Sequence, residues 1–148
     1  MSNKILSVKQ LRKHFSVKNV WGTDIALVKA LDGVDLEIEK GKTFGIVGES
    51  GCGKTTLMRT LLRLVEPTSG SVVLSEELTE GKFSSNNLEE LTSEELRSFR
   101  RKIGVVFQDP MGALNPRMLI KDIVGEPLVI HGKTDKVRER VIELLNDV

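Results

Sequence analysis

The sequence predicts an α/β domain in which a glycine-rich turn joins a buried strand to a helix. Residues 43–47 form a short, nearly continuous apolar run, which is typical of a strand buried on both faces. The glycine-rich turn 48–53 follows at once. Residues 54–65 then place their apolar side chains on one helical face, namely Leu57, Met58, Leu61, Leu62 and Val65. Strand, turn and helix in this order favour the α/β class.

The residues before this unit predict antiparallel strands. Residues 5–15 mix apolar and basic side chains, and we expect an edge strand there. Residues 18–24 hold Gly22 and polar residues and are expected to form a loop. Residues 26–38 include a strictly alternating stretch, which predicts a half-buried strand, and residues 40–42 form a turn. A mostly antiparallel sheet near the N-terminus is therefore expected to precede a parallel core.

The segment after the predicted helix is expected to return to the sheet. Pro67 ends the helix, and residues 71–74 form the next strand. Residues 76–91 are polar, which predicts a surface loop. Thr92 and Glu95 have the spacing of a capping box, so a short helix is expected to begin there.

The last third of the chain alternates again between strand and helix. The short helix is expected to end near Arg101, and residues 103–107 predict another buried strand. Two prolines and a glycine in residues 108–117 indicate an ordered but irregular loop. Residues 134–148 are amphipathic and predict a helix.

Composition excludes several classes of protein. The chain has 148 residues and a net charge of +1, which gives no electrostatic reason to expect a nucleic-acid partner. Its single cysteine, Cys52, rules out an intramolecular disulfide framework and fits a reducing compartment. No apolar run approaches the roughly 20 residues of a membrane-spanning helix. If the protein works at a membrane, we expect it to do so from the cytoplasmic side through a partner.

The glycine-rich turn matches a phosphate-binding motif. Residues 48–55, Gly-Glu-Ser-Gly-Cys-Gly-Lys-Thr, fit G-x-x-x-x-G-K-[ST]. Glycines let successive backbone N–H groups converge on a phosphate. Lys54 supplies a mobile cation, and the Thr55 hydroxyl is a hard oxygen ligand suited to Mg²⁺. The following helix directs its positive end at the anion. The motif alone leaves the nucleotide and the reaction open, because kinases, GTPases and motor ATPases share it.

Cys52 occupies a free position of this loop and has two interpretations. A small side chain there needs no special role. Its place beside Lys54 and a helix N-terminus also favours a reactive thiolate.

Several stretches, in order and at familiar spacing, resemble the ABC ATPases. Residues 48–56 look like their Walker A motif, and residues 30–34 resemble the strand before it. Residues 67–71 resemble the turn after the first helix, and residues 105–110 resemble the Q-loop. The resemblance implies a P-loop NTPase fold, namely an ABC-type nucleotide-binding domain that binds ATP with Mg²⁺.

A narrower likeness points to one group of importers. Residues 107–118 and 126–128 are similar to the ATPases of oligopeptide and dipeptide importers, and most like the second of their two ATPase subunits. Nickel and glutathione importers have close relatives of this stretch. The resemblance implies a subunit that energises peptide import by ATP binding and hydrolysis, peripheral on the cytoplasmic face of the membrane. Its implied partners are a second ATPase subunit, transmembrane permease subunits and, indirectly, an extracytoplasmic solute-binding protein.

The resemblance also assigns roles to residues. Lys54 and the loop amides are expected to hold the β- and γ-phosphates, Thr55 to ligate Mg²⁺, and Thr56 to lie near the α-phosphate. Gln108 is expected to reach the Mg²⁺ and the attacking water and to sense the membrane subunit. Lys54 and Gln108 are thus the predicted catalytic residues, and Thr55 and Gln108 the predicted metal ligands. The predicted nucleotide-binding set is Phe15, Gly48, Ser50, Gly51, Cys52, Gly53, Lys54, Thr55, Thr56 and Gln108.

Two aromatic residues compete for the adenine ring. Phe15 matches the position of the family's stacking aromatic, and stacking on a base contributes roughly 1–3 kcal/mol in nucleic-acid complexes. Trp21 is a rival because the loop before Ala26 is longer than in minimal members. Neither His14 nor His131 matches the family's switch histidine, and both are expected to be ordinary surface or turn residues.

The chain departs from the family pattern by what its 148 residues do not contain. The Leu-Ser-Gly-Gly-Gln signature, the Walker B carboxylates and the switch histidine are missing. Residues 1–148 are therefore predicted to be the N-terminal portion of a truncated ABC domain, with an antiparallel β subdomain and the start of a helical subdomain. Without a Walker B glutamate, we expect weak nucleotide binding and negligible turnover. The alternatives are a natural short protein completed by a partner, or a non-hydrolysing docking fragment. Without the strands that normally pack beside them, the predicted strands 43–47 and 103–107 would have exposed apolar edges.

Overall fold

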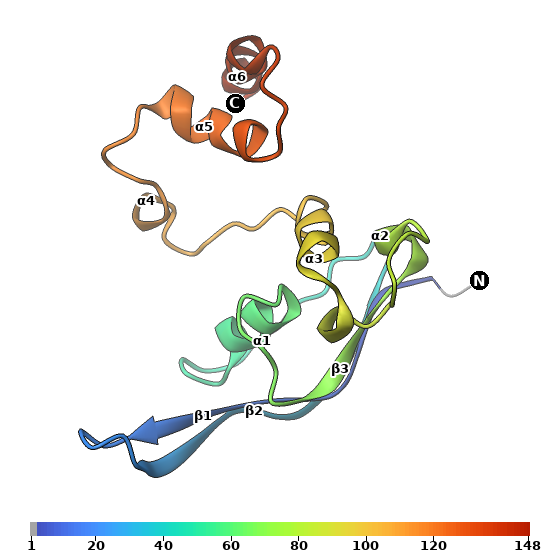
Figure 1. Ribbon diagram of the computed structural model, residues 1–148, viewed down its shortest axis with the longest axis vertical. Helices are drawn as coiled ribbons and strands as arrows, with labels where there is room; N and C mark the ends of the chain where they lie inside the picture. The colour runs from blue at the N-terminus through green and yellow to red at the C-terminus, as the bar shows by residue number, and fades with distance from the viewer. Residues whose placement is uncertain (1–2) are drawn as a thin grey trace. The chain divides into compact units, whose positions relative to one another are not determined.

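A computed structural model describes residues 3–148, with the backbone alone at Pro110 and Met111. The chain divides after Gly104 into two compact units. Figure 1 shows the elements of both units.

The first unit is built on a three-stranded antiparallel sheet. Its strands are β1 (Lys4–Lys18), β2 (Asp24–Glu39) and β3 (Ser69–Leu74), in the order β2-β1-β3. The strand expected at the edge is therefore the central one, because β3 pairs with its free side. This pairing covers only Leu6–Arg12 of β1. The rest of the β1–β2 hairpin extends past β3 as a two-stranded ribbon (Figure 1).

A bulge in β1 directs its apolar residues into the core. Leu6 and Val8 alternate with more exposed neighbours, as a half-buried strand requires. Gln10 then takes a left-handed φ of 48°, and the register shifts between Val8 and Leu11. The alternation therefore moves by one residue, and Leu11 also becomes fully buried.

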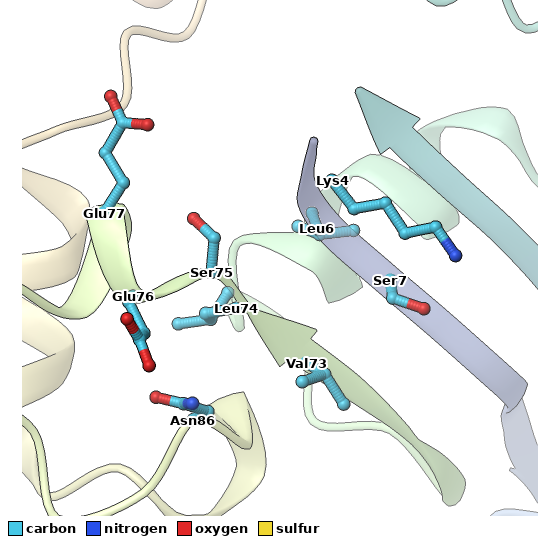
Figure 2. Close-up of a pocket in the computed structure, with 9 residues that line it drawn as sticks. All are labelled: Lys4, Leu6, Ser7, Val73, Leu74, Ser75, Glu76, Glu77 and Asn86. Carbon is cyan, nitrogen blue, oxygen red and sulfur yellow. The ribbon is translucent and has the colours of Figure 1, made fainter. Parts of the chain in front are cut away.

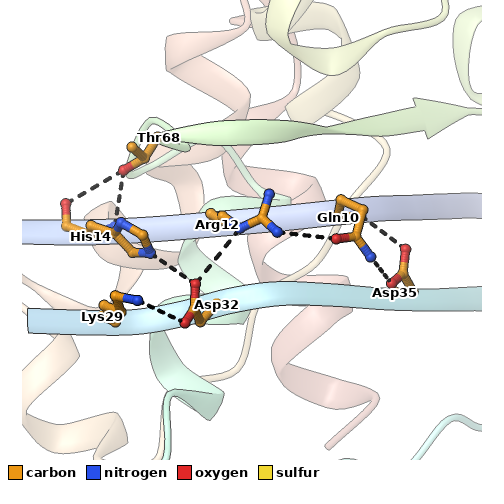
Figure 3. Close-up of polar contacts among 7 residues, drawn as sticks. All are labelled: Gln10, Arg12, His14, Lys29, Asp32, Asp35 and Thr68. Atoms are coloured by element: carbon orange, nitrogen blue, oxygen red, sulfur yellow. Dashed lines mark hydrogen bonds and ion pairs between the residues drawn. The ribbon is translucent and has the colours of Figure 1, made fainter.

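Side-chain contacts link the two strands of the ribbon beyond the bulge (Figure 3). Asp32 of β2 accepts a hydrogen bond from Lys29 at 3.2 Å and lies 3.6 Å from Arg12 Nε and 3.3 Å from His14 Nε2. The hydrogen bond from Lys29 is the largest cause that lowers the pKa of Asp32. The His14 backbone N–H donates to Thr68 Oγ1 at 2.9 Å. His14 therefore has structural partners on both sides of β1.

Helices cover one face of the sheet and complete the core. The first is α1 (Lys54–Leu61), which is shorter than the predicted helix 54–65 because residues 62–65 turn away. Its Leu57 joins a buried apolar cluster that also contains Leu6, Val8, Leu11, Leu31, Val72, Leu74, Leu88, Leu91 and Phe99.

The predicted surface loop 76–91 was wrong in part. It contains α2 (Glu76–Thr79) and the 3₁₀ helix η1 (Leu88–Glu90), and it buries Thr79 and Leu88. Elements of one turn are too short to show a helical period, so the polar composition hid them.

The predicted capping-box helix is confirmed as α3 (Ser93–Arg100). The Thr92 hydroxyl accepts from the Glu95 N–H, and the Glu95 carboxylate accepts from the Thr92 N–H. These reciprocal bonds satisfy backbone donors that a helix start otherwise leaves unpaired. Phe99 on the inner face of α3 is fully buried.

The two predicted buried strands, 43–47 and 103–107, are wrong for this chain. Both segments lie outside the sheet, and no strand among residues 3–148 pairs with either. Val47 and Val106 are 93% and 94% exposed. Apolar composition predicts burial, but a strand also needs neighbours for its backbone groups.

The second unit contains three helices. They are α4 (Pro110–Ala113), α5 (Ile120–Ile130) and α6 (Val137–Asn146). The amphipathic helix predicted near the C-terminus is confirmed as α6, whose Val141 is buried. The sequence did not predict α5, because Pro127 within it reads as a helix breaker. Among the described residues, no helix has both the length and the apolar character needed to cross a membrane.

Candidate nucleotide-binding site

The loop that precedes α1 depends on glycines in left-handed conformations. Gly51 and Gly53 have φ angles of 82° and 97°, which side chains disfavour. A Cβ on Gly53 would lie 2.4 Å from the carbonyl oxygen of Ala30, so only glycine allows this close approach. The start of α1 therefore sits directly against the backbone of β2.

The position of Ala30 in β2 explains this contact. Lys13 pairs with Leu31 and His14 with Lys29, which leaves Ala30 as the extra residue of a bulge. Nothing in the sequence marks Ala30 as part of the site, because its contribution is a backbone carbonyl. Only the fold brings this carbonyl to Gly53.

Lys54 lies across the loop. Its Nζ donates hydrogen bonds of 2.7 Å to each of the Gly48 and Glu49 carbonyl oxygens and lies 3.4 Å from Cys52 Sγ. The Cys52 N–H closes the turn on the Glu49 carbonyl at 3.3 Å. No carboxylate among the described residues forms an ion pair with Lys54. Its charge is balanced only by neutral acceptors, which an anion could replace.

The N-terminal end of α1 suits an anionic ligand. Gly53 is its cap residue and has no side chain to accept the first N–H groups, and the first turn contains no acidic residue. The positive end of the helix and the Lys54 ammonium therefore act on the same loop. A nucleotide phosphate fits this donor set.

The residues of this chain supply only some of the ligands that Mg²⁺ needs. Thr55 is exposed in the first turn of α1, where its hydroxyl could ligate a metal. No group of three or more His, Cys, Asp or Glu residues in the described part of the chain could hold a metal ion. A bound Mg²⁺ would therefore need nucleotide oxygens or water for most of its ligands.

The remaining loop residues lie where the motif places them. Ser50 and Cys52 are exposed in the turn, and Thr56 is half-buried in α1. The Thr56 carbonyl accepts a hydrogen bond from the Thr60 hydroxyl at 2.8 Å.

Phe15 and Trp21 differ in their relation to the loop. Leu11, Lys13 and Phe15 share one face of β1 by alternation, and this face carries the core that Leu57 of α1 joins. Phe15 is 40% exposed, with Lys13 Nζ 4.9 Å from its ring centroid. Trp21 lies in the hairpin turn and is 89% exposed. This arrangement favours Phe15 as the stacking residue, which stays a prediction.

Gln108 belongs to the second unit. It is exposed at a bend that follows residues 103–107. Its predicted roles at the Mg²⁺ and the attacking water stay predictions.

A cavity of about 540 Å³ lies apart from the loop residues (Figure 2). Lys4 and Ser7 of β1 line one side, and Glu76, Glu77 and Asn86 line the other. None of the predicted nucleotide-binding residues lines it. The candidate site is therefore the open loop and not this cavity.

The hairpin, the glycine loop and the lysine together define a P-loop nucleotide-binding domain. A family model described as ABC transporter matches residues 31–148. The chain therefore belongs to the ABC transporter family, as its motifs indicated.

The chain is also similar to curated proteins that are described as transport ATP-binding proteins. The chain is 44% identical to the oligopeptide transport ATP-binding protein OppF of Bacillus subtilis, over 100% of this chain and 45% of the relative. It is 38% identical to the di/tripeptide transport ATP-binding protein DppF of Pseudomonas aeruginosa, over 97% of this chain and 42% of the relative. The chain thus spans less than half the length of these relatives.

Solved structures confirm the predicted fold class. The dimeric ATP-binding cassette MJ0796, in a post-hydrolysis state with ADP and Pi, superposes with a TM-score of 0.72 at 27% identity. The match covers 95% of this chain and 56% of that one. The cbiO1 protein of Clostridium perfringens, part of an ABC transporter complex, gives a TM-score of 0.63 at 25% identity, over 98% of this chain and 50% of that one.

Proposed function

We propose that this chain is the nucleotide-binding portion of an ATP-binding subunit that energises ABC-type import of peptides. The observation that carries the proposal is the Lys54 ammonium, which two carbonyls hold across the loop and which forms no ion pair with a carboxylate of the described residues. The family and the printed names of the relatives, which are transporters of oligopeptides and di/tripeptides, support the peptide cargo.

The residues of the loop divide the work of holding the nucleotide. Lys54 exchanges its carbonyl acceptors for β- and γ-phosphate oxygens, and the N–H groups of the loop donate to the same anion. Thr55 supplies a hydroxyl to Mg²⁺, and Thr56 lies near the α-phosphate. Phe15 would stack on adenine, and Gln108 would serve as a ligand of the metal and orient water. Bound Mg²⁺ supplies neutralisation of the charge on the phosphates.

Hydrolysis is assigned to the longer subunit and not to these residues alone. Positioning of the attacking water is a role of the Walker B glutamate, which these 148 residues do not include, and an ATPase assay of this chain is expected to give negligible turnover. In the whole transporter, the partners are a second ATPase subunit and transmembrane permease subunits on the cytoplasmic face. An extracytoplasmic solute-binding protein delivers the cargo.

Two alternatives keep the same fold. One is a non-hydrolysing nucleotide-binding or docking fragment, and the other is a subunit for nickel or glutathione import. ATPase activity that returns in a chain extended to the length of the relatives would exclude the first. Transport assays with peptides, nickel and glutathione would separate the second.

The direct test is calorimetric titration of MgATP into the chain, with Lys54→Ala as the control. We expect binding by the original chain and its loss in the variant, because the ammonium faces the phosphates. Circular dichroism confirms that both proteins are folded. A folded original chain that binds no MgATP would contradict the proposal that this portion binds nucleotide by itself.

A further inference from the structure

The C-terminal end of α1 has an unusual residue at its turn. The Leu64 N–H donates to the Arg59 carbonyl at 2.8 Å, and the Arg63 N–H donates to the Thr60 carbonyl at 2.9 Å. These two bonds form a Schellman motif, in which the residue after the C-cap Leu62 is left-handed and is usually glycine. Here that residue is Arg63, with φ of 50°. The chain therefore keeps a strained backbone conformation at Arg63, where glycine would be relaxed.

The Arg63 side chain makes contacts that glycine could not make. Its Nη1 donates to the carbonyls of Leu88 and Leu91 at 3.2 and 2.7 Å. Leu88 is the first residue of η1, and Leu91 is its C-cap. Its Nε pairs with Glu66 at 3.0 Å, and only 18% of the side chain is exposed. The strained position thus directs a guanidinium from the end of α1 onto η1.

A second arginine holds the same helix end from the opposite direction. Arg100, the last residue of α3, donates from Nε to the Leu62 carbonyl at 3.2 Å. It also donates from Nη2 to the Arg63 carbonyl at 2.7 Å. Carbonyls at a helix end lack partners within the helix, so Arg100 supplies them. Arg63 and Arg100, which we call the arginine clamp, therefore fasten α1 to η1 and α3.

The length of α1 connects this clamp to the phosphate loop. The helix has eight residues and is about 12 Å long, so a tilt at its C-terminal end moves its N-terminal end. The N-terminal end is located by the contact of Gly53 with Ala30. We propose that Arg63 and Arg100 are positioning residues, which hold the loop and Lys54 in the geometry that receives phosphate. This inference rests on the proposed function for the identity of the ligand.

Hydrogen exchange followed by mass spectrometry tests the clamp in the full chain without nucleotide. The variants Arg63→Met and Arg100→Met keep an apolar stem and remove the donors. Arg59→Met is the matched control, because Arg59 is exposed on the same helix. We expect exchange of amides 50–62 to rise about tenfold in the clamp variants, since two hydrogen bonds are lost. The exchange rates of the β1 amides should stay unchanged in the clamp variants, and those of amides 50–62 should stay unchanged in Arg59→Met.

Calorimetric titration with MgADP measures how the clamp affects nucleotide affinity. We expect the affinity to fall about tenfold in the clamp variants and to stay unchanged in Arg59→Met. Arg100→Lys, which keeps the charge but not the two-pronged geometry, should give an intermediate loss. It also replaces Arg100→Met if that variant does not fold.

The outcomes separate the clamp from the proposed function. Original exchange rates in the loop, or an equal rise in β1 and the loop, would overturn the clamp, because only a local opening supports positioning. If the original chain binds no MgADP while the loop opens in the variants, the proposed function fails and the clamp stands. If the variants bind MgADP as tightly as the original chain, the clamp fails and the proposed function stands.

Discussion

Gly53 shows how one residue joins the fold to the site. Its left-handed φ starts α1, and its missing side chain admits the Ala30 carbonyl. The motif predicted a glycine here for the sake of the phosphate, and the fold adds a second requirement from the sheet. Both the phosphate and the sheet therefore require that residue 53 has no Cβ atom.

Gly53→Ala is expected to destabilise the chain and to abolish MgATP binding. The left-handed backbone costs an alanine about 1–2 kcal/mol, and its Cβ would also meet the Ala30 oxygen at 2.4 Å. Thermal unfolding and calorimetry measure the two effects. Gly22→Ala is the control, because Gly22 has φ of 80° but no atom within 4 Å of an added Cβ. An equal loss of stability in both variants would mean that the Ala30 contact contributes nothing.

The predictable residues of the site are those that a motif names. Gly48, Gly51, Gly53, Lys54 and Thr55 could be identified from spacing alone, because the motif itself assigns them to phosphate binding. Arg63 and Arg100 could not be identified this way. The first is an arginine where helix-end rules favour glycine, and both act on backbone carbonyls that the sequence does not reveal.

At the scale of elements, α3 has the clearest local cause. The Glu95 carboxylate accepts hydrogen bonds from the Ser84 and Thr92 N–H groups and from both hydroxyls. These bonds, led by the Ser84 N–H, lower the pKa of Glu95 from 4.5 to about 2. The same side chain therefore caps α3 and holds the preceding loop.

This lowered pKa predicts an acid-dependent contribution to stability. A carboxyl with a folded pKa below its unfolded value stabilises the fold above the unfolded pKa, here 4.5, and loses this contribution as the pH falls toward 2. Glu95→Gln should therefore unfold at lower urea than the original chain at pH 7. The difference should shrink between pH 4.5 and 2. Glu94→Gln in the same turn is the control, and a pH-independent difference for Glu95→Gln would contradict the linkage.

Elements were predictable where their cause is local. The capping box lies within four residues, so α3 could be predicted with its start. The antiparallel strands followed from alternation. Residues 43–47 and 103–107 show the converse, because a strand is completed by its neighbours and composition does not say whether they are present. The helix α5 was hidden by Pro127, which the structure accommodates inside it.

At the scale of the whole molecule, apolar surface outside the core is the main feature. Both units carry nearly fully exposed valines, among them Val47 in the first unit and Val106 in the second. Exposed apolar segments of this kind promote association. Substitutions at these positions should therefore change the self-association of the chain more than its folding stability.

Val106→Lys is expected to reduce association without loss of folding stability. Val106 is 94% exposed, so a charge there costs no burial, and surface substitutions usually change stability by less than about 0.5 kcal/mol. Light scattering measures association and urea unfolding measures stability. Val141→Lys, at a position that is 3% exposed, is the control that should disrupt packing. A large loss of stability in Val106→Lys would show that this valine is buried in solution.

The class of the molecule was more predictable than its sheet. Motifs in family order identified an ABC domain, and the family match bears this out. The expected parallel core does not form among residues 3–148, whose sheet is antiparallel throughout. Sequence motifs indicate the class of ligand and the family. Strand pairing depends on every segment that shares the sheet, so the motifs do not predict it.

The bulge at Ala30 has a consequence for the order in which the chain is assembled during synthesis. β2 follows β1 after residues 19–23, so the hairpin can pair as soon as both strands leave the ribosome. All residues of the bulge, Ala30 included, precede Gly53 in the chain. The phosphate loop therefore leaves the ribosome after both strands of the hairpin that it packs against, and β3, which pairs with the other side of β1, follows last.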